Sequence, residues 1–115
     1  MATKKSVHGA LTPAQLELVA ARFRALGVPS RLRVLNALRD GAMGMGELAV
    51  ATGMQQSNIS RQVTELERAG CVERDRQGRE VTVRIADPTL VELCDLVCGS
   101  LLRQAKQEHA SLLGR

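Results

Sequence analysis

The segment from residue 45 to residue 86 constrains the fold of this chain most, because its pattern predicts two short helices followed directly by a hairpin. Gly53 ends the first predicted helix, over 46–53, and Gly70 ends the second, over 57–70, with 54–56 as the turn between them. Alternating apolar residues on either side of Gln77-Gly78 predict a β-hairpin over 71–86. We therefore expect a helix-turn-helix whose second helix can enter a DNA major groove, with a charged hairpin beside it.

Three further helices are predicted outside this segment. Thr12 and Gln15 form a capping box for a helix that ends at Gly27. Apolar residues recur along it at helical spacing, which predicts a buried face: Leu16, Val19, Ala20, Phe23 and Leu26. Pro29 opens a second helix that ends at Gly41, and its inward face is expected to carry Leu32, Leu35 and Leu38. A loop is expected over 41–46, and a long last helix over 89–113, capped by Asp87 or Thr89. The predicted fold class is mainly α with a small β-hairpin, a winged helix-turn-helix.

The last helix is apolar on more than one face. One stripe holds Leu90, Cys94, Val97, Leu101, Ala105 and Leu112, and Leu93, Leu96, Cys98 and Leu102 broaden it. A terminal helix of this kind needs a partner helix, so we predict a homodimer formed through the terminal helices. The alternative is that the helix packs wholly within its own chain. At 115 residues, we expect a flexible tail over 1–10 and one domain for DNA binding and dimerisation over 11–115.

Composition narrows the class of partner. Phe23 is the only aromatic residue, so the chain offers no set of stacking platforms for single-stranded nucleic acid. A net charge of +4, mostly from arginine, suits phosphate contact. The first residues lack the apolar run of a secretion signal, and no apolar run is long enough to span a membrane. Three cysteines without scaffold spacing favour free thiols in a reducing cytoplasm.

Three segments, taken in order, resemble the ArsR/SmtB family of winged-helix repressors. They are ALGVPSRLRVL at 25–35, the helix-turn-helix at 46–72, and RQGREVTVRI at 76–85. The resemblance covers roughly residues 14–105. It implies a homodimer that binds operator DNA and leaves it when an inducer binds.

The family's known inducer sites do not match. Many members carry paired cysteines in the loop before the first motif helix, where this chain has AMGMG at 42–46. Other members carry Asp and His on the last helix at a spacing that differs from Cys94, Asp95, Cys98, Glu108 and His109 here. The resemblance therefore does not name the inducer.

The residues expected to contact DNA lie at the start of the second motif helix and at the hairpin tip. They are Gln56, Ser57, Asn58, Ser60, Arg61 and Gln62 on the helix, and Arg76 and Arg79 in the hairpin. Arginine can bind guanine and an amide can bridge adenine, while hairpin arginines suit phosphates or the minor groove. A solvated helix face is the alternative for the first group. Ion pairing within the hairpin is the alternative for its arginines, which include Arg74 and Arg84.

Cys94 and Cys98 lie four residues apart, which puts their Cβ atoms about 5–6 Å apart on one helix face. That spacing is too wide for an unstrained disulfide and suits two thiolates on one soft metal ion. We expect a third ligand from Cys71, Asp95, a group near His109 or the other subunit. Core packing is the stronger alternative for Cys71, and solvent exposure is the expectation for His8 and His109. A cross-subunit disulfide is also open.

These observations predict a cytoplasmic repressor that needs no cofactor. Its release from the operator would follow binding of As(III), Cd(II), Pb(II) or Zn(II), or reaction with reactive sulfur or an oxidant. Two alternatives remain at this stage: a winged helix that binds an acidic protein instead of DNA, and a repressor whose cysteines sense nothing. No catalytic signature surrounds any cysteine, so an enzyme is not expected.

Overall fold

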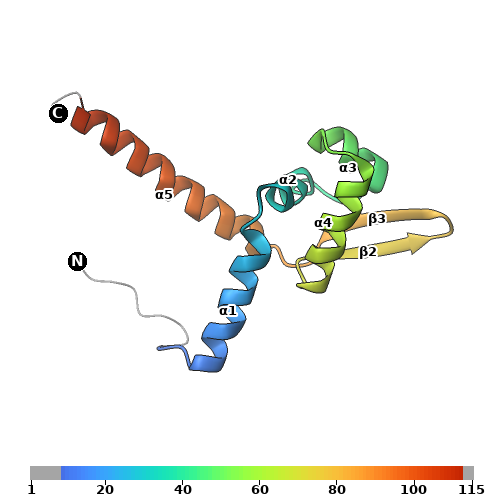
Figure 1. Cartoon of the computed structure of the whole chain (residues 1–115), viewed down its shortest axis with the longest axis horizontal. Helices are drawn as coiled ribbons and strands as arrows, with labels where there is room; N and C mark the ends of the chain where they lie inside the picture. The colour runs from blue at the N-terminus through green and yellow to red at the C-terminus, as the bar shows by residue number, and fades with distance from the viewer. Residues whose placement is uncertain (1–8, 113–115) are drawn as a thin grey trace.

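The computed structural model describes residues 9–112 and confirms the winged helix-turn-helix (Figure 1). Residues 1–8, and with them His8 and most of the expected tail over 1–10, lie outside the described part. The elements, in chain order, are α1 (Pro13–Leu26), α2 (Pro29–Ala37), β1 (Met43–Gly44), α3 (Met45–Thr52), α4 (Gln56–Arg68), β2 (Val72–Gln77), β3 (Glu80–Ile85) and α5 (Thr89–Leu112).

The helix-turn-helix forms where the glycine and apolar spacing predicts it. Gly53 adopts a left-handed conformation with φ of 70°, which ends α3 and turns the chain into α4. The apolar side chains of the two helices then meet in the core, where Leu48, Ile59, Val63 and Leu66 are fully buried. Because these residues anchor α4 along one side, its opposite side is held facing outward.

The hairpin is part of a three-stranded antiparallel sheet in the order β1-β3-β2. β2 and β3 pair from Val72 with Ile85 to Gln77 with Glu80, and Gly78 takes a φ of 64° at the tip. The expectation of a loop over 41–46 was wrong in part, since Met43 and Gly44 pair with β3 as a short edge strand. This extra strand fixes the base of the wing to the start of α3.

α1 and α2 depart from the predicted burial. The capping box forms at Thr12 and Gln15, but only Ala25 and Leu26 of α1 are buried, and Phe23 is 52% exposed. α2 ends at Ala37, before the predicted stop at Gly41, and Leu32 is exposed although it was expected to face inward. The first two helices therefore leave apolar surface that the rest of residues 9–112 does not cover.

α5 begins where predicted, with the Thr89 backbone N–H donating to Asp87 Oδ1 at 3.0 Å. Hydrogen bonding by the Thr89 side chain and backbone lowers the pKa of Asp87. Leu90 and Leu93 pack its first turns against the core, and the helix then projects away (Figure 1). The radius of gyration, 17.6 Å, exceeds the roughly 13 Å of a compact domain of this length. Over residues 9–112, no helix combines the length and apolarity that crossing a membrane requires.

Candidate nucleic-acid interface and thiol site

The first turns of α4 present a polar, outward-facing surface. Asn58 is half-buried, and the other predicted residues on this face are exposed: Gln56, Ser57, Ser60 and Arg61. Gln55 provides no side-chain cap within the described chain, so the free backbone N–H groups at this helix start can donate to a phosphate. The surface thus combines side chains able to contact base edges with backbone donors suited to an anion.

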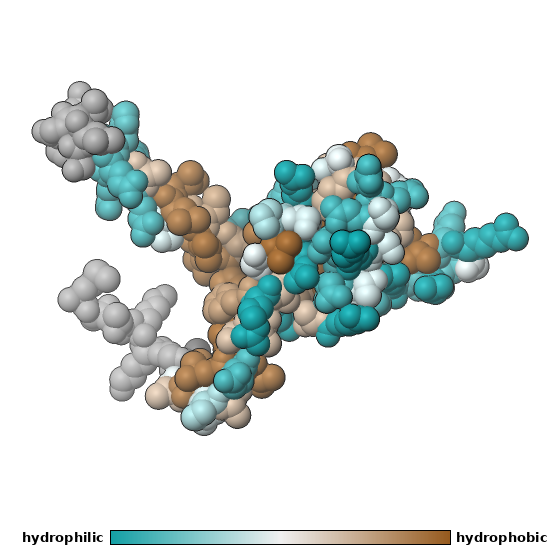
Figure 2. Space-filling model, in the orientation of Figure 1, coloured by the Kyte–Doolittle hydropathy of each residue, from teal (hydrophilic) through white to brown (hydrophobic). Residues whose placement is uncertain are grey.

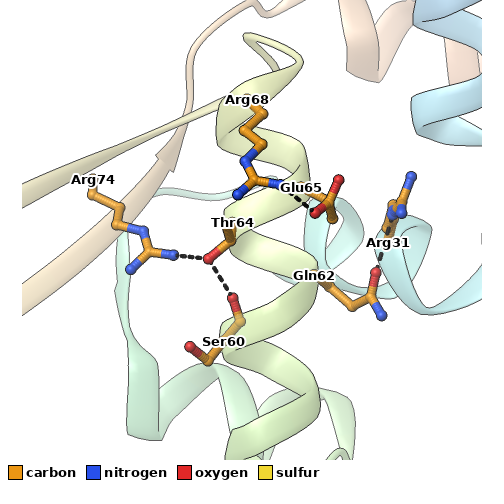
Figure 3. Close-up of polar contacts among 7 residues, drawn as sticks. All are labelled: Arg31, Ser60, Gln62, Thr64, Glu65, Arg68 and Arg74. Atoms are coloured by element: carbon orange, nitrogen blue, oxygen red, sulfur yellow. Dashed lines mark hydrogen bonds and ion pairs between the residues drawn. The ribbon is translucent and has the colours of Figure 1, made fainter.

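Gln62 does not belong to that surface. It was predicted to face DNA, but it is only 9% exposed and points toward α2. Its Oε1 accepts from Arg31 Nε at 3.0 Å, and its Nε2 donates to Asn58 Oδ1 at 3.0 Å (Figure 3 shows the Arg31 contact). Sequence spacing on one helix suggests the Asn58 contact, since the two residues are four apart. Nothing local in the sequence predicts Arg31 as the partner.

The tip of the wing carries two free cations. Arg76 and Arg79 are exposed, and neither forms an ion pair within residues 9–112. Arg84 instead donates to Glu73 across the hairpin, with Nε at 3.1 Å from Oε2, and this contact raises the pKa of Arg84. The wing therefore offers Arg76 and Arg79 to a phosphate, while Arg84 is already paired.

Arg74 faces the helix-turn-helix instead of the hairpin's free surface. Its Nη2 donates to Thr64 Oγ1 at 2.6 Å, and that hydroxyl donates to the Ser60 carbonyl at 2.9 Å (Figure 3). Its Nε lies 3.4 Å from Glu67 Oε1, close enough for an ion pair but outside hydrogen-bond geometry, and is buried. Arg74 thus joins β2 to α4 and holds the wing in a fixed position beside the exposed surface of α4.

Cys94 and Cys98 line an apolar groove between the ends of α1 and α2 and the first half of α5. The groove has a volume of about 510 Å³, and its walls include Phe23, Leu32 and Leu101. Both thiols are free, with Cys94 half-buried and Cys98 exposed. The predicted pair therefore shares one accessible, mostly apolar surface.

The groups proposed as a third metal ligand are not available beside the pair in one chain. Cys71 is fully buried in the core, where burial raises the pKa of its thiol. Arg39 binds the Asp95 carboxylate in a two-point contact that lowers the pKa of Asp95. His109 lies eleven residues beyond Cys98, about 16 Å along the helix axis. Among residues 9–112, no three His, Cys, Asp or Glu side chains gather as metal ligands.

Comparison with known proteins places this geometry in a family. Residues 29–80, from α2 to the wing, match a MarR family model. Rv0081 of Mycobacterium tuberculosis, an uncharacterised HTH-type transcriptional regulator, is 37% identical over 98 residues, which cover 84% of this chain and 85% of Rv0081. The crystal structure of Rv0081 matches at a TM-score of 0.74, with 32% identity over 85% of this chain and 98% of that one. The HTH-type transcriptional repressor SmtB of M. tuberculosis is 33% identical over 78 residues, which cover 68% of this chain and 58% of SmtB. The chain belongs to the ArsR/SmtB family of winged-helix transcriptional regulators.

Other members of the ArsR/SmtB family agree with this assignment. The regulator NmtR of M. tuberculosis is 40% identical over 77 residues, 67% of this chain but only 64% of NmtR. The antimony-specific transcriptional repressor AntR matches at a TM-score of 0.76, with 30% identity over 93% of this chain and 98% of AntR. The homodimeric DNA-binding domain of Mb0332 from Mycobacterium bovis matches at 0.69, with 31% identity over 88% and 90%. This ArsR/SmtB chain is thus a DNA-binding transcriptional regulator and not an enzyme.

Proposed function

We propose that this regulator is a homodimeric repressor that reads operator DNA with α4, contacts the flanking backbone with its wing, and leaves DNA when an effector binds at Cys94 and Cys98. The observation that carries the DNA-reading part is the exposed polar face of α4, together with the exposed Arg76 and Arg79, which form no ion pair among residues 9–112. Five predicted helix residues, Gln56, Ser57, Asn58, Ser60 and Arg61, would contact bases or phosphates. Gln62 is no longer among them, because it is buried against α2.

Arg61 is the proposed base-reading side chain, since an exposed arginine on a groove-entering helix can bind guanine at two points. We expect Arg61→Ala to weaken operator binding by about 1–3 kcal/mol and to relax sequence preference. Arg68→Ala is the matched control, because Arg68 lies on the last turn of the same helix and pairs with Glu65. Equal loss on operator and random DNA for Arg61→Ala would refute the assigned role.

The homodimer proposal rests on uncovered apolar surface. Leu96, Leu101 and Leu102 are 72%, 58% and 66% exposed along α5, and Phe23 and Leu32 continue this surface onto α1 and α2. Figure 2 shows apolar side chains gathered along α5, whereas hydrophilic ones cover much of the winged-helix body. A monomer rarely leaves so much contiguous apolar surface in water. A second copy is the occupant we propose, because Mb0332, a family member of matching fold, is a homodimer.

Sedimentation equilibrium would test the homodimer. We expect Leu101→Glu to shift the protein toward monomer, because it places a charge in the apolar surface that the two chains would share. Val50→Glu is the matched control, since Val50 is 85% exposed on α3, away from α5. A wild-type monomer at micromolar concentration, or equal effects of the two substitutions, would contradict the proposal.

Thiol chemistry supports the proposed effector class. Cys94 and Cys98 are free, share one helix face and open into the groove, so they can supply two soft sulfur ligands. No third ligand lies beside them among residues 9–112, and so we propose that the partner subunit supplies it. AntR is an antimony-specific repressor, and antimony shares the trivalent, sulfur-binding chemistry of As(III). The candidates are As(III), Cd(II), Pb(II) and Zn(II), with reactive sulfur as the redox alternative, all acting in a reducing cytoplasm.

Effector release can be measured on the operator complex of the reduced protein. Titration with each metal ion, As(III) and a persulfide donor should lower operator affinity for one of them, by about 5–150-fold. We expect the Cys94→Ser, Cys98→Ser double variant to bind the operator normally and to lose this response, while Cys71→Ala keeps it. An unchanged response in the double variant would show that the cysteines are not the sensor.

A further inference from the structure

Three side chains form a continuous polar chain from α2 into the exposed surface of α4. Arg31 Nε donates to Gln62 Oε1 at 3.0 Å, and Gln62 Nε2 donates to Asn58 Oδ1 at 3.0 Å. Arg31 is itself held by the end of α1, because its Nη1 donates to the Ala25 carbonyl at 3.2 Å. Gln62 in the middle is buried, while Asn58 at the far end is only half-buried. This series of hydrogen bonds therefore begins at the Ala25 carbonyl and ends at the exposed surface of α4.

The chemistry of Arg31 sets the direction of both side-chain hydrogen bonds in this series. A guanidinium donates and never accepts, so Gln62 must turn its oxygen toward Arg31. The Gln62 amide nitrogen then faces Asn58, and Asn58 must turn its own oxygen inward to accept. The group that Asn58 turns toward an outside partner is then its amide N–H₂. One arginine on α2 thereby decides which end of an α4 asparagine faces outward.

We propose that Arg31, acting through Gln62, positions Asn58 as a hydrogen-bond donor to DNA. The inference rests on the proposed reading of DNA by α4 and assigns Asn58 a narrower role there. Bridging adenine would need the Asn58 oxygen to face DNA together with its nitrogen, and the bond from Gln62 holds that oxygen toward the protein interior. The partner is therefore an acceptor, either a phosphate oxygen or a base-edge acceptor such as purine N7. Arg31 and Gln62 are positioning residues, since neither is on the exposed face.

A double-mutant cycle on operator affinity tests this coupling. Affinity for the operator is measured at one salt concentration, with affinity for a random duplex beside it, because a lost base contact weakens operator binding alone whereas a lost phosphate contact weakens both. We expect Asn58→Ala to lower operator affinity about tenfold, the scale of one hydrogen bond in each subunit. Gln62→Met, an apolar substitution of similar length, should lower it by a similar factor, and the double variant should lose no more than either single variant. Losses that multiply in the double variant would overturn the proposal.

Arg31→Met should behave as Gln62→Met does, and Arg33→Met is its control, because Arg33 is exposed on the same helix. The free protein gives a readout that needs no DNA: Gln62→Met and Arg31→Met should shift the side-chain amide NMR signals of Asn58, and Arg33→Met should not. Unshifted Asn58 signals in a folded variant would refute the positioning of Asn58 by Arg31 and Gln62. A wild-type protein with no operator preference would instead refute the reading of DNA by α4.

Modified operators distinguish the two acceptor sources. A 7-deazapurine removes one base-edge acceptor, and a methylphosphonate removes one phosphate charge and acceptor. We expect one of these changes, at one position in each half-site, to weaken wild-type binding about tenfold and to leave Asn58→Ala unaffected. If Asn58→Ala responds to every modification as strongly as the wild type does, Asn58 donates to neither acceptor and the proposal fails.

Discussion

The wing arginines give the sharpest quantitative prediction. Arg76 and Arg79 are exposed and form no ion pair within the described part of the chain, so removing them breaks no ion pair there. Each phosphate that a protein neutralises adds about 0.9 to the slope of log affinity against log salt. In a homodimer the Arg76→Ala, Arg79→Ala double variant removes four such contacts, which lowers the slope by about 3.6. Between 50 and 200 mM salt, the wild type should lose about 150-fold more affinity than the variant.

The assay is fluorescence anisotropy with operator and random duplexes over that salt range. Both DNAs should show the same loss of slope, because phosphate contacts carry no sequence information. The control is an Arg84→Ala, Arg103→Ala double variant, which removes the same charge from a wing arginine paired with Glu73 and from an arginine on α5. An equal change of slope in the control would mean that net charge alone sets the effect. An unchanged slope in the test variant would refute phosphate contact by the wing tip.

Three further predictions concern the fold. Leu66→Ala should lower the free energy of unfolding by about 2–5 kcal/mol in urea titrations, since Leu66 is fully buried in the core. Burial raises the pKa of Cys71, so the free energy of unfolding should fall as pH rises above 9.0. Cys71→Ala should lack that fall, and identical stability profiles of the variant and the wild type at alkaline pH would contradict this. Arg39 lowers the pKa of Asp95, so this contact should stabilise the fold above pH 3.8 and fade below it; Asp95→Asn should reduce the acid-side loss of stability.

The parts of the fold that sequence predicted well depend on neighbours close in the chain. Gly53 and the apolar spacing of α4 are local signals, and they placed the helix-turn-helix within a residue or two. The wing followed for the same reason, from strand alternation around Gly78. β1 did not follow, because two residues carry no periodicity and Met43 finds its partner Val83 forty positions away.

The site was harder to predict where a residue's direction depends on a distant partner. Gln62 has the side chain and the helix position expected of a DNA-reading residue, yet its hydrogen bond from Arg31 on α2 holds it inward. Arg74 is drawn to Thr64 on α4 in the same way. Leu32 and Phe23 follow the helical pattern of core residues but stay exposed in one chain, and the proposed second copy would cover them. Helical spacing identifies an apolar face and does not specify which chain covers it.

Selection of bound duplexes from a randomised DNA pool tests the central claim most directly. The reduced full-length protein is incubated with the pool, and the retained sequences are read after several rounds. A homodimer that reads DNA through α4 predicts one enriched site with two inverted half-sites, whose centres lie about one helical turn, or a multiple of it, apart. The Arg61→Ala variant should lose preference at one position in each half-site. Retention of DNA without any enriched sequence would mean that the protein binds charge alone, and it would contradict the account.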